Sequence, residues 1–108
     1  MTLANPVRGE ATLVIHGESQ ILRPTFTALV AAEEELGSLF ALVERASAGQ
    51  LRLSELAALF WHCLAYPGAL TRADVGEAVA VQGLAASAAP LRALLVQILQ
   101  GQTSPGSG

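Results

Sequence analysis

Few side chains in this sequence are able to do chemistry beyond packing. His16, His62 and Cys63 carry the only imidazole and thiol groups among the 108 residues. His62 and Cys63 are adjacent, and adjacent residues on a helix point about 100° apart, so they cannot chelate one metal ion or form a nucleophilic Cys–His pair. Only His16 could reach Cys63, and nothing in the sequence places it there. We therefore predict that Cys63 is a core residue, and we expect no metal and no cofactor.

The hydroxyl groups and glycines show no catalytic pattern either. The segment Gly17-Glu18-Ser19-Gln20 lacks the closing glycine of a nucleophile elbow, and it lies in a predicted hairpin turn. A phosphate-binding loop needs a lysine after a glycine-rich run, and the sequence contains no lysine. These absences lead us to expect that the protein is not an enzyme.

Three consecutive acids, Glu33 to Glu35, form the only run of charge. Glu33 lies on the apolar stripe of a predicted helix, four residues after Leu29 and three before Leu36. A carboxylate in that position must be paired or lie at a rim. Two interpretations follow, namely an ion pair or hydrogen bond with an arginine inside the fold, and contact with a partner. One such carboxylate does not make a general acid–base pair.

The elements that must position these groups begin with a β-hairpin. Apolar and polar residues alternate from Ala11 to His16, and Gly17 is able to adopt the positive φ of a tight turn. Pro24 ends the returning strand because it has no amide hydrogen for the ladder. We predict a hairpin over about Val7–Arg23. An isolated hairpin is barely stable, so its apolar face must lie on helices.

From Thr25 onward the hydrophobic period is helical, which predicts an α+β fold with four to five short helices between about residues 26 and 100. Thr25, Ser38 and Ser54 are the expected N-caps of the first three helices, and the third should cover about Glu55–Tyr66. Thr71 to Asp74 has the form of a capping box for the fourth. Pro90 either starts the regular part of the last helix or kinks it. The residues expected to face inward are Phe26, Leu29, Val30, Leu36, Leu39, Leu42, Val43, Ala46, Val75, Ala78, Val79, Leu91, Leu94, Leu95, Ile98 and Leu99.

Composition narrows the class of protein. The chain is 52% hydrophobic and 14% charged with a net charge of −3, which excludes a disordered chain and gives no basic footprint for nucleic acid. No apolar run is long enough for a transmembrane helix, and no signal peptide is visible, so we expect a cytoplasmic protein without membrane contact. We predict a single domain over residues 1–102 and a flexible tail over 103–108.

The third helix is predicted to be apolar almost all round. Trp61 lies on a different face from Phe60 and Cys63, with Ala58 and Ala65 beside it. Such a helix is either central in its domain or covered by a partner, in which case Trp61 anchors the interface. The broad apolar stripe of the last helix has the same two interpretations, core or partner groove. The candidate partner-binding residues are Glu33, Ala58, Trp61 and Ala65.

The order of these segments resembles the gene transfer agent family proteins, which are related to phage tail assembly chaperones and also labelled as tail tube proteins. The resemblance covers about residues 5–100. It starts at Asn5-Pro6-Val7-Arg8-Gly9-Glu10 and includes Leu29–Gly37, where Glu33 matches the family's acid. It continues through Leu53–Leu56, Thr71–Gly83 and the closing helix. The Phe60–Cys63 stretch is bulkier than that pattern.

The resemblance implies a non-enzymatic role in building the tail of a phage or gene transfer agent. A chaperone-like protein of this kind would bind the tape-measure protein, the tail tube protein or other unassembled tail components in the cytoplasm of the bacterial host. The alternative is a structural component of the tail itself, such as the tube or its end. Whether the chain also forms a homo-oligomer stays open.

Overall fold

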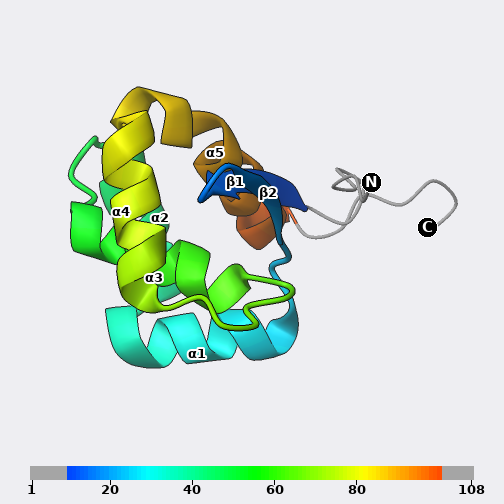
Figure 1. Cartoon of the computed structure of the whole chain (residues 1–108). Helices are drawn as coiled ribbons and strands as arrows, with labels where there is room; N and C mark the ends of the chain where they lie inside the picture. The colour runs from blue at the N-terminus through cyan, green and yellow to red at the C-terminus, as the bar shows by residue number, and fades with distance from the viewer. Residues whose placement is uncertain (1–9, 101–108) are drawn as a thin grey trace, which may run out of the picture.

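The computed structural model describes residues 10–100 and has the predicted α+β architecture. The expected start of the hairpin at Val7 and the expected tail over 103–108 lie outside these residues. In Figure 1 the hairpin packs beside α5, while α3 lies between α1 and α4. The elements are β1 (Ala11–Ile15), β2 (Glu18–Leu22), α1 (Phe26–Leu36), α2 (Leu39–Ser47), α3 (Leu53–Cys63), α4 (Arg72–Gln82) and α5 (Leu84–Gln100).

The hairpin closes with a tighter turn than the sequence pattern indicated. His16 and Gly17 have φ values of 53° and 79°, the pair of positive φ angles that a type I′ turn requires. Glu18 and Ser19 therefore belong to β2 and not to the turn, and Glu18 is paired with Ile15. The twist of this two-residue turn matches the twist of the strands, so no longer connection is needed.

Side-chain caps start most of the helices where the sequence predicts them. The Thr25 hydroxyl accepts a hydrogen bond from the Ala28 N–H at 3.1 Å, and Ser38 accepts one from the Ala41 N–H. The capping box of α4 is also confirmed, because Thr71 and Asp74 each accept a hydrogen bond from the other's backbone N–H. These bonds satisfy amide groups that a helix N-terminus leaves without partners.

The third helix differs from its predicted bounds of Glu55–Tyr66 at both ends. Its N-cap is Arg52 and not Ser54, and the Arg52 N–H donates to the carboxylate of Glu55 at 3.0 Å. It ends at Cys63 because the backbone beyond joins the hairpin: Leu64 bridges Leu22, and the Ala65 N–H donates to the Ile21 carbonyl. Backbone pairing with β2 replaces the last helical turn.

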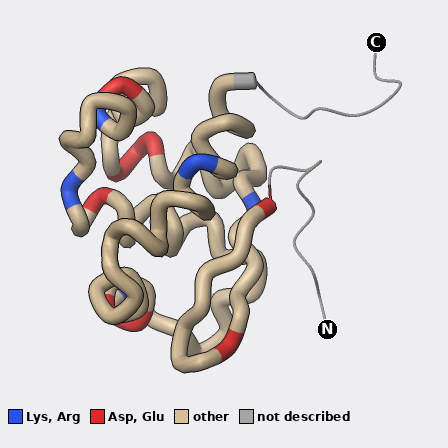
Figure 2. Tube along the Cα trace, turned by 90° about the horizontal axis from the view of Figure 1, so that it is seen from above, with Lys and Arg blue, Asp and Glu red and all other residues tan. Residues whose placement is uncertain are grey.

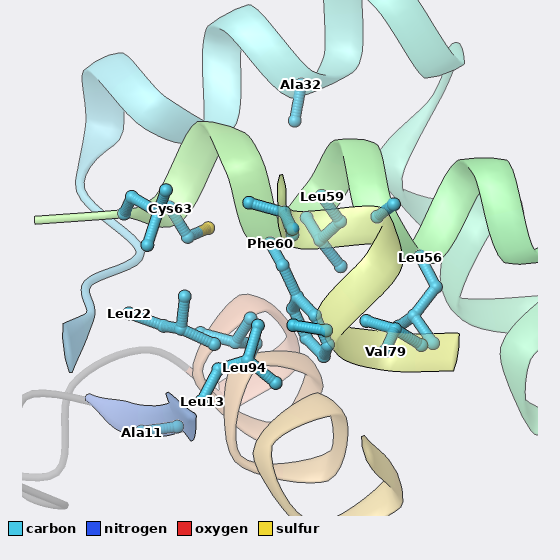
Figure 3. Packing of buried hydrophobic residues seen from close by; sticks show 14 of the residues in the cluster. Ala11, Leu13, Leu22, Ala32, Leu56, Leu59, Phe60, Cys63, Val79 and Leu94 are labelled. Carbon is cyan, nitrogen blue, oxygen red and sulfur yellow. The ribbon is translucent and has the colours of Figure 1, made fainter. Parts of the chain in front are cut away.

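The core forms where the hairpin, α3, α4 and α5 meet. Figure 3 shows Phe60 of α3 reaching between α4 and α5, with Leu94 near Leu13 and Leu22 of the hairpin. All four of these side chains are buried. This packing gives the hairpin the apolar support that an isolated pair of strands lacks.

Helix α1 contacts this core through a stripe that the sequence analysis placed wrongly. Phe26 and Val30 were expected to face inward, but Phe26 is 84% exposed and Val30 is also exposed. The buried residue is Ala32, and Leu29 and Leu36 pack around it. A small side chain at the centre of the stripe lets α1 approach α3 closely, and Figure 3 shows Ala32 pointing toward α3.

Helix α5 is continuous from Leu84 to Gln100 and contains Pro90 in its interior. The regular helix therefore begins six residues before the proline. Pro90 lacks the N–H that would bond to the fourth preceding carbonyl, so one helical hydrogen bond is missing there. Within residues 10–100 no single helix is long and apolar enough to cross a membrane, and α4 with α5 meets the length and composition criteria only as a pair bent by 120°.

Candidate partner-binding groove

The groups that could do chemistry do not converge on one site: the two histidines each contact an acid on another element, and Cys63 is buried. His16 in the hairpin turn has its Nε2 atom 3.1 Å from Oδ1 of Asp74 on α4. Burial raises the pKa of the Cys63 thiol to about 12, so the thiol is protonated at neutral pH. In the part of the chain that the structure describes, no three His, Cys, Asp or Glu side chains are grouped to hold a metal ion.

Glu35 links three helices. Its carboxylate contacts Arg72 on α4, and the Nε2 atom of His62 on α3 lies 2.8 Å from Oε1 of Glu35. The hydrogen bond with the Arg72 guanidinium has the largest effect in lowering the pKa of Glu35 below its usual value, and the hydrogen bond with the His62 ring lowers it further. Among Glu33, Glu34 and Glu35, the acid that pairs with an arginine is therefore Glu35, whereas the sequence analysis singled out Glu33.

Glu33 makes a different contact, to backbone. Its Oε2 atom accepts a hydrogen bond from the N–H of Leu39 at 3.1 Å, at the first residue of α2. A carboxylate at a helix N-terminus satisfies an otherwise free amide and interacts favourably with the helix dipole. Glu33 thereby holds the junction between α1 and α2, next to a surface groove.

That groove runs between α2 and α5 and has two adjoining parts. The larger part has a volume of about 520 Å³, and the smaller part has a volume of about 180 Å³. Val43 and Leu99 line both parts, which places the parts next to each other. The larger part is lined by Val43, Ala46, Ser47, Ala88, Leu91, Arg92, Leu95, Val96 and Leu99, and the smaller part by Glu33, Leu39, Phe40, Val43, Ile98 and Leu99.

Large apolar side chains on both walls of the groove are open to solvent. Phe40 on α2 is 76% exposed, and Leu99 on α5 is 55% exposed. Two charged residues line it, Glu33 of α1 in the smaller part and Arg92 of α5 in the larger part. Within residues 10–100 the Arg92 side chain has neither an ion pair nor a hydrogen bond. The groove is thus lined mainly by apolar side chains, with one acidic and one basic residue among them.

The other basic residues do not gather into a surface. Arg23, Arg45 and Arg72 pair with Glu10, Glu55 and Glu35 respectively. Figure 2 shows the basic positions apart from one another along the trace. The described residues therefore present no basic patch of the kind that binds nucleic acid.

The predicted partner-binding residues lie at different depths. Glu33 lines the groove. Ala58 is 2% exposed inside the core, so its side chain is covered by the protein's own packing and offers no surface to a partner. Trp61 is half-buried and packs against the core, and Ala65 is half-buried after the end of α3; neither lines the groove. The groove was signalled only by the broad apolar stripe of the last helix.

One comparison with known proteins assigns the family. The profile of a family described as "Phage tail tube protein, GTA-gp10" matches residues 8–101. No curated protein and no solved structure matches the chain. The match spans both strands and all five helices that carry the groove and the core, so the chain belongs to this family of phage tail proteins.

Proposed function

We propose that the protein is a non-enzymatic, chaperone-like tail assembly factor of a phage or gene transfer agent. It binds the tape-measure protein, the tail tube protein or another unassembled tail component in the cytoplasm of the bacterial host. The observation that carries the proposal is the open apolar groove between α2 and α5. Family membership supports a role among tail proteins.

The groove supports binding because it leaves large apolar side chains exposed to water. Fully burying one Leu, Val or Phe side chain is worth about 1.5–3 kcal/mol, and Phe40, Val96 and Leu99 are all exposed along it. A small acidic domain with an open apolar groove suits the task of shielding another chain's apolar helices until that chain assembles.

Binding of purified tail proteins tests the proposal. The full-length chain is mixed with the tape-measure protein and, separately, with the tail tube protein of the same particle, and complex formation is followed by sedimentation. We expect a soluble complex with at least one of them and less aggregation of that partner. Failure to bind either protein, with the chain folded by circular dichroism, would refute the proposal.

The second candidate is a structural part of the tail, either the tube or its end, and the family description favours it. The two functions differ in what the finished particle contains. A tube subunit is present in many copies per purified particle, whereas a chaperone leaves before the particle is complete. Quantitative mass spectrometry of purified particles separates them: a copy number equal to that of the repeating tube subunit assigns the tube, and absence assigns the chaperone.

A further inference from the structure

We infer that Gly83 is a hinge through which two copies of the chain exchange helix α5, which gives a domain-swapped dimer. In that dimer α4 and α5 join into one continuous helix, and each α5 packs in the core of the other copy. The exchange needs no tail protein, so it goes beyond the proposed function and does not depend on it.

The connection between α4 and α5 consists of one residue. Helix α4 ends at Gln82 and α5 begins at Leu84, and the two helices are bent by 120° relative to each other. Gly83 has a φ of 87° and a ψ of 156°, a backbone conformation that is essentially restricted to glycine. Figure 1 shows the chain turning sharply between α4 and α5. The folded-back position of α5 therefore depends on the two dihedral angles of a single glycine.

The sequence after Gly83 favours a helix without a break. Residues 84–89 read Leu-Ala-Ala-Ser-Ala-Ala, and alanine has the highest helix propensity. Gly83 has no side chain to accept hydrogen bonds from the first amides of α5, whereas Thr71 caps α4 in this way. In a joined helix those amides bond to the carbonyls at the end of α4 instead. Straightening at Gly83 thus satisfies donors that the bent form leaves without a side-chain cap.

Two large apolar side chains beside the hinge are exposed in the monomer. Val81 of α4 is 79% exposed, and Leu84 of α5 is 62% exposed. They are three residues apart, so a joined helix carries them on one face. The two joined helices of a swapped dimer cross beside Gly83, because α4 of one copy packs against α5 of the other as these helices pack in the monomer. The crossing lets Val81 and Leu84 of the two copies bury each other, which selects a second copy as the partner.

The site that receives α5 is the same in the monomer and in the exchanged form. Leu94 is completely buried beside Leu13 and Leu22 of the hairpin (Figure 3). The Leu94 of a second copy makes these contacts equally well, because the two chains are identical. Helix α5 is the last of the described elements, so no other described element has to move with it. The balance between monomer and dimer is therefore set at the hinge and not in the core.

Refolding at high protein concentration tests the exchange. The wild-type chain and Gly83→Ala are each refolded from guanidinium, diluted in steps, left to equilibrate and followed by sedimentation. Gly83→Ala should lower the dissociation constant of the dimer about tenfold or more, because alanine disfavours the bent backbone and favours the joined helix. The added Cβ meets no atom within 4 Å in the bent form, so crowding is not the cause.

Gly49→Ala is the matched control for backbone strain. It places alanine at another positive φ, 72°, where the added Cβ also meets no atom within 4 Å. Gly49 lies in the longer connection between α2 and α3. The control should therefore leave the dissociation constant of the dimer unchanged.

Serine substitutions at the crossing point give a second measurement. Val81→Ser combined with Leu84→Ser should raise the dissociation constant about tenfold, because the apolar contact between the two copies is lost. Both side chains are exposed in the monomer, so the double variant should fold. Phe26→Ser removes an exposed apolar side chain on α1 and should leave the dissociation constant unchanged. An unchanged constant in the double variant would overturn the contact between the two hinges.

NMR on mixed chains observes the exchange directly. Chains with isotope-labelled leucine methyl groups and unlabelled chains are mixed, unfolded and refolded together. Isotope-filtered nuclear Overhauser effects then select contacts between different chains. We expect such contacts from Leu94 of one chain to Leu13 or Leu22 of the other.

Two results would overturn the inference. The first is that the wild-type chain and Gly83→Ala are folded by circular dichroism but stay monomeric at every concentration. The second is a dimer in which Leu94 contacts the hairpin of its own chain only, since that dimer forms through another surface. Should Gly83→Ala not fold, the wild-type chain carries the test through the same NMR contacts. None of these results measures the binding of tail proteins, so the proposed function is judged separately.

Discussion

Glu35 connects α1 to both α3 and α4, whereas its neighbours Glu33 and Glu34, which have the same side chain, do not. It contacts Arg72 and His62, and its side chain is 37% exposed. Its folded-state pKa lies below the usual 4.5, so its stabilising effect is complete above about pH 4.5 and is lost as pH falls through the folded-state pKa.

Replacement of Glu35 tests this linkage. Glu35→Gln should lower the free energy of unfolding at pH 7 by about 0.5–1 kcal/mol, because the exposed pair is partly screened. The difference from wild type should shrink as pH falls below 4.5. Urea unfolding at several pH values measures both effects. Glu34→Gln is the matched control, since Glu34 is exposed and makes no ion pair or hydrogen bond among the described residues. An equal loss in both variants would contradict the assignment.

The sequence analysis singled out Glu33 as the acid of this run that could pair with an arginine, but in the structure Glu35 is the acid that does so. The choice depended on the rotation of α1 about its axis. That rotation is set by Ala32 against α3, and a hydrophobicity pattern gives a single small alanine little weight beside Phe26. The apolar stripe thus predicted the helix correctly and its inward face incorrectly.

At the scale of the element, helix ends differ in how far local sequence determines them. The caps at Thr25, Ser38 and Thr71 depend on side chains within three residues, and the sequence predicted all three. The end of α3 depends on β2, which lies about forty residues earlier in the chain. No local pattern encodes such pairing.

Substitutions at Thr71 and Ser54 test the confirmed cap of α4 and the reassigned cap of α3. Thr71→Ala should destabilise the protein by about 1 kcal/mol, because it removes the acceptor for the Asp74 N–H. Ser54→Ala should change stability by less than about 0.5 kcal/mol, because Ser54 is an exposed residue inside α3 and not its N-cap. Thermal melts compare the two variants. A larger loss for Ser54→Ala would restore the cap expected from sequence.

In the assembled molecule, helix α5 has one apolar surface that is buried in the core and another that is open to solvent. Leu94 of α5 is completely buried against the hairpin and α3, whereas Leu99 of the same helix opens into the groove. The sequence predicted both as inward residues of one broad stripe. Which part of the stripe is covered depends on where α2 lies relative to α5, and that follows from the assembled fold and not from the stripe.

A matched pair of leucine variants measures this division. Leu94→Ala should cost about 2–5 kcal/mol of stability, because it leaves a cavity in the core. Leu99→Ala should change stability by less than about 0.5 kcal/mol, since its side chain is already in contact with water. Guanidinium unfolding of both variants provides the values. Comparable losses would mean that the groove is closed in solution.

Cys63 gives the molecule an internal reporter of opening. It is the single cysteine of the chain, and its side chain is buried at the last residue of α3, directly before the bridge between Leu64 and Leu22 of the hairpin. A thiol-reactive dye can attack it only after that junction separates, so the labelling rate follows the opening equilibrium when closing is fast. Comparing the labelling rate with and without a bound tail protein would then show whether binding makes this junction open less often or more often.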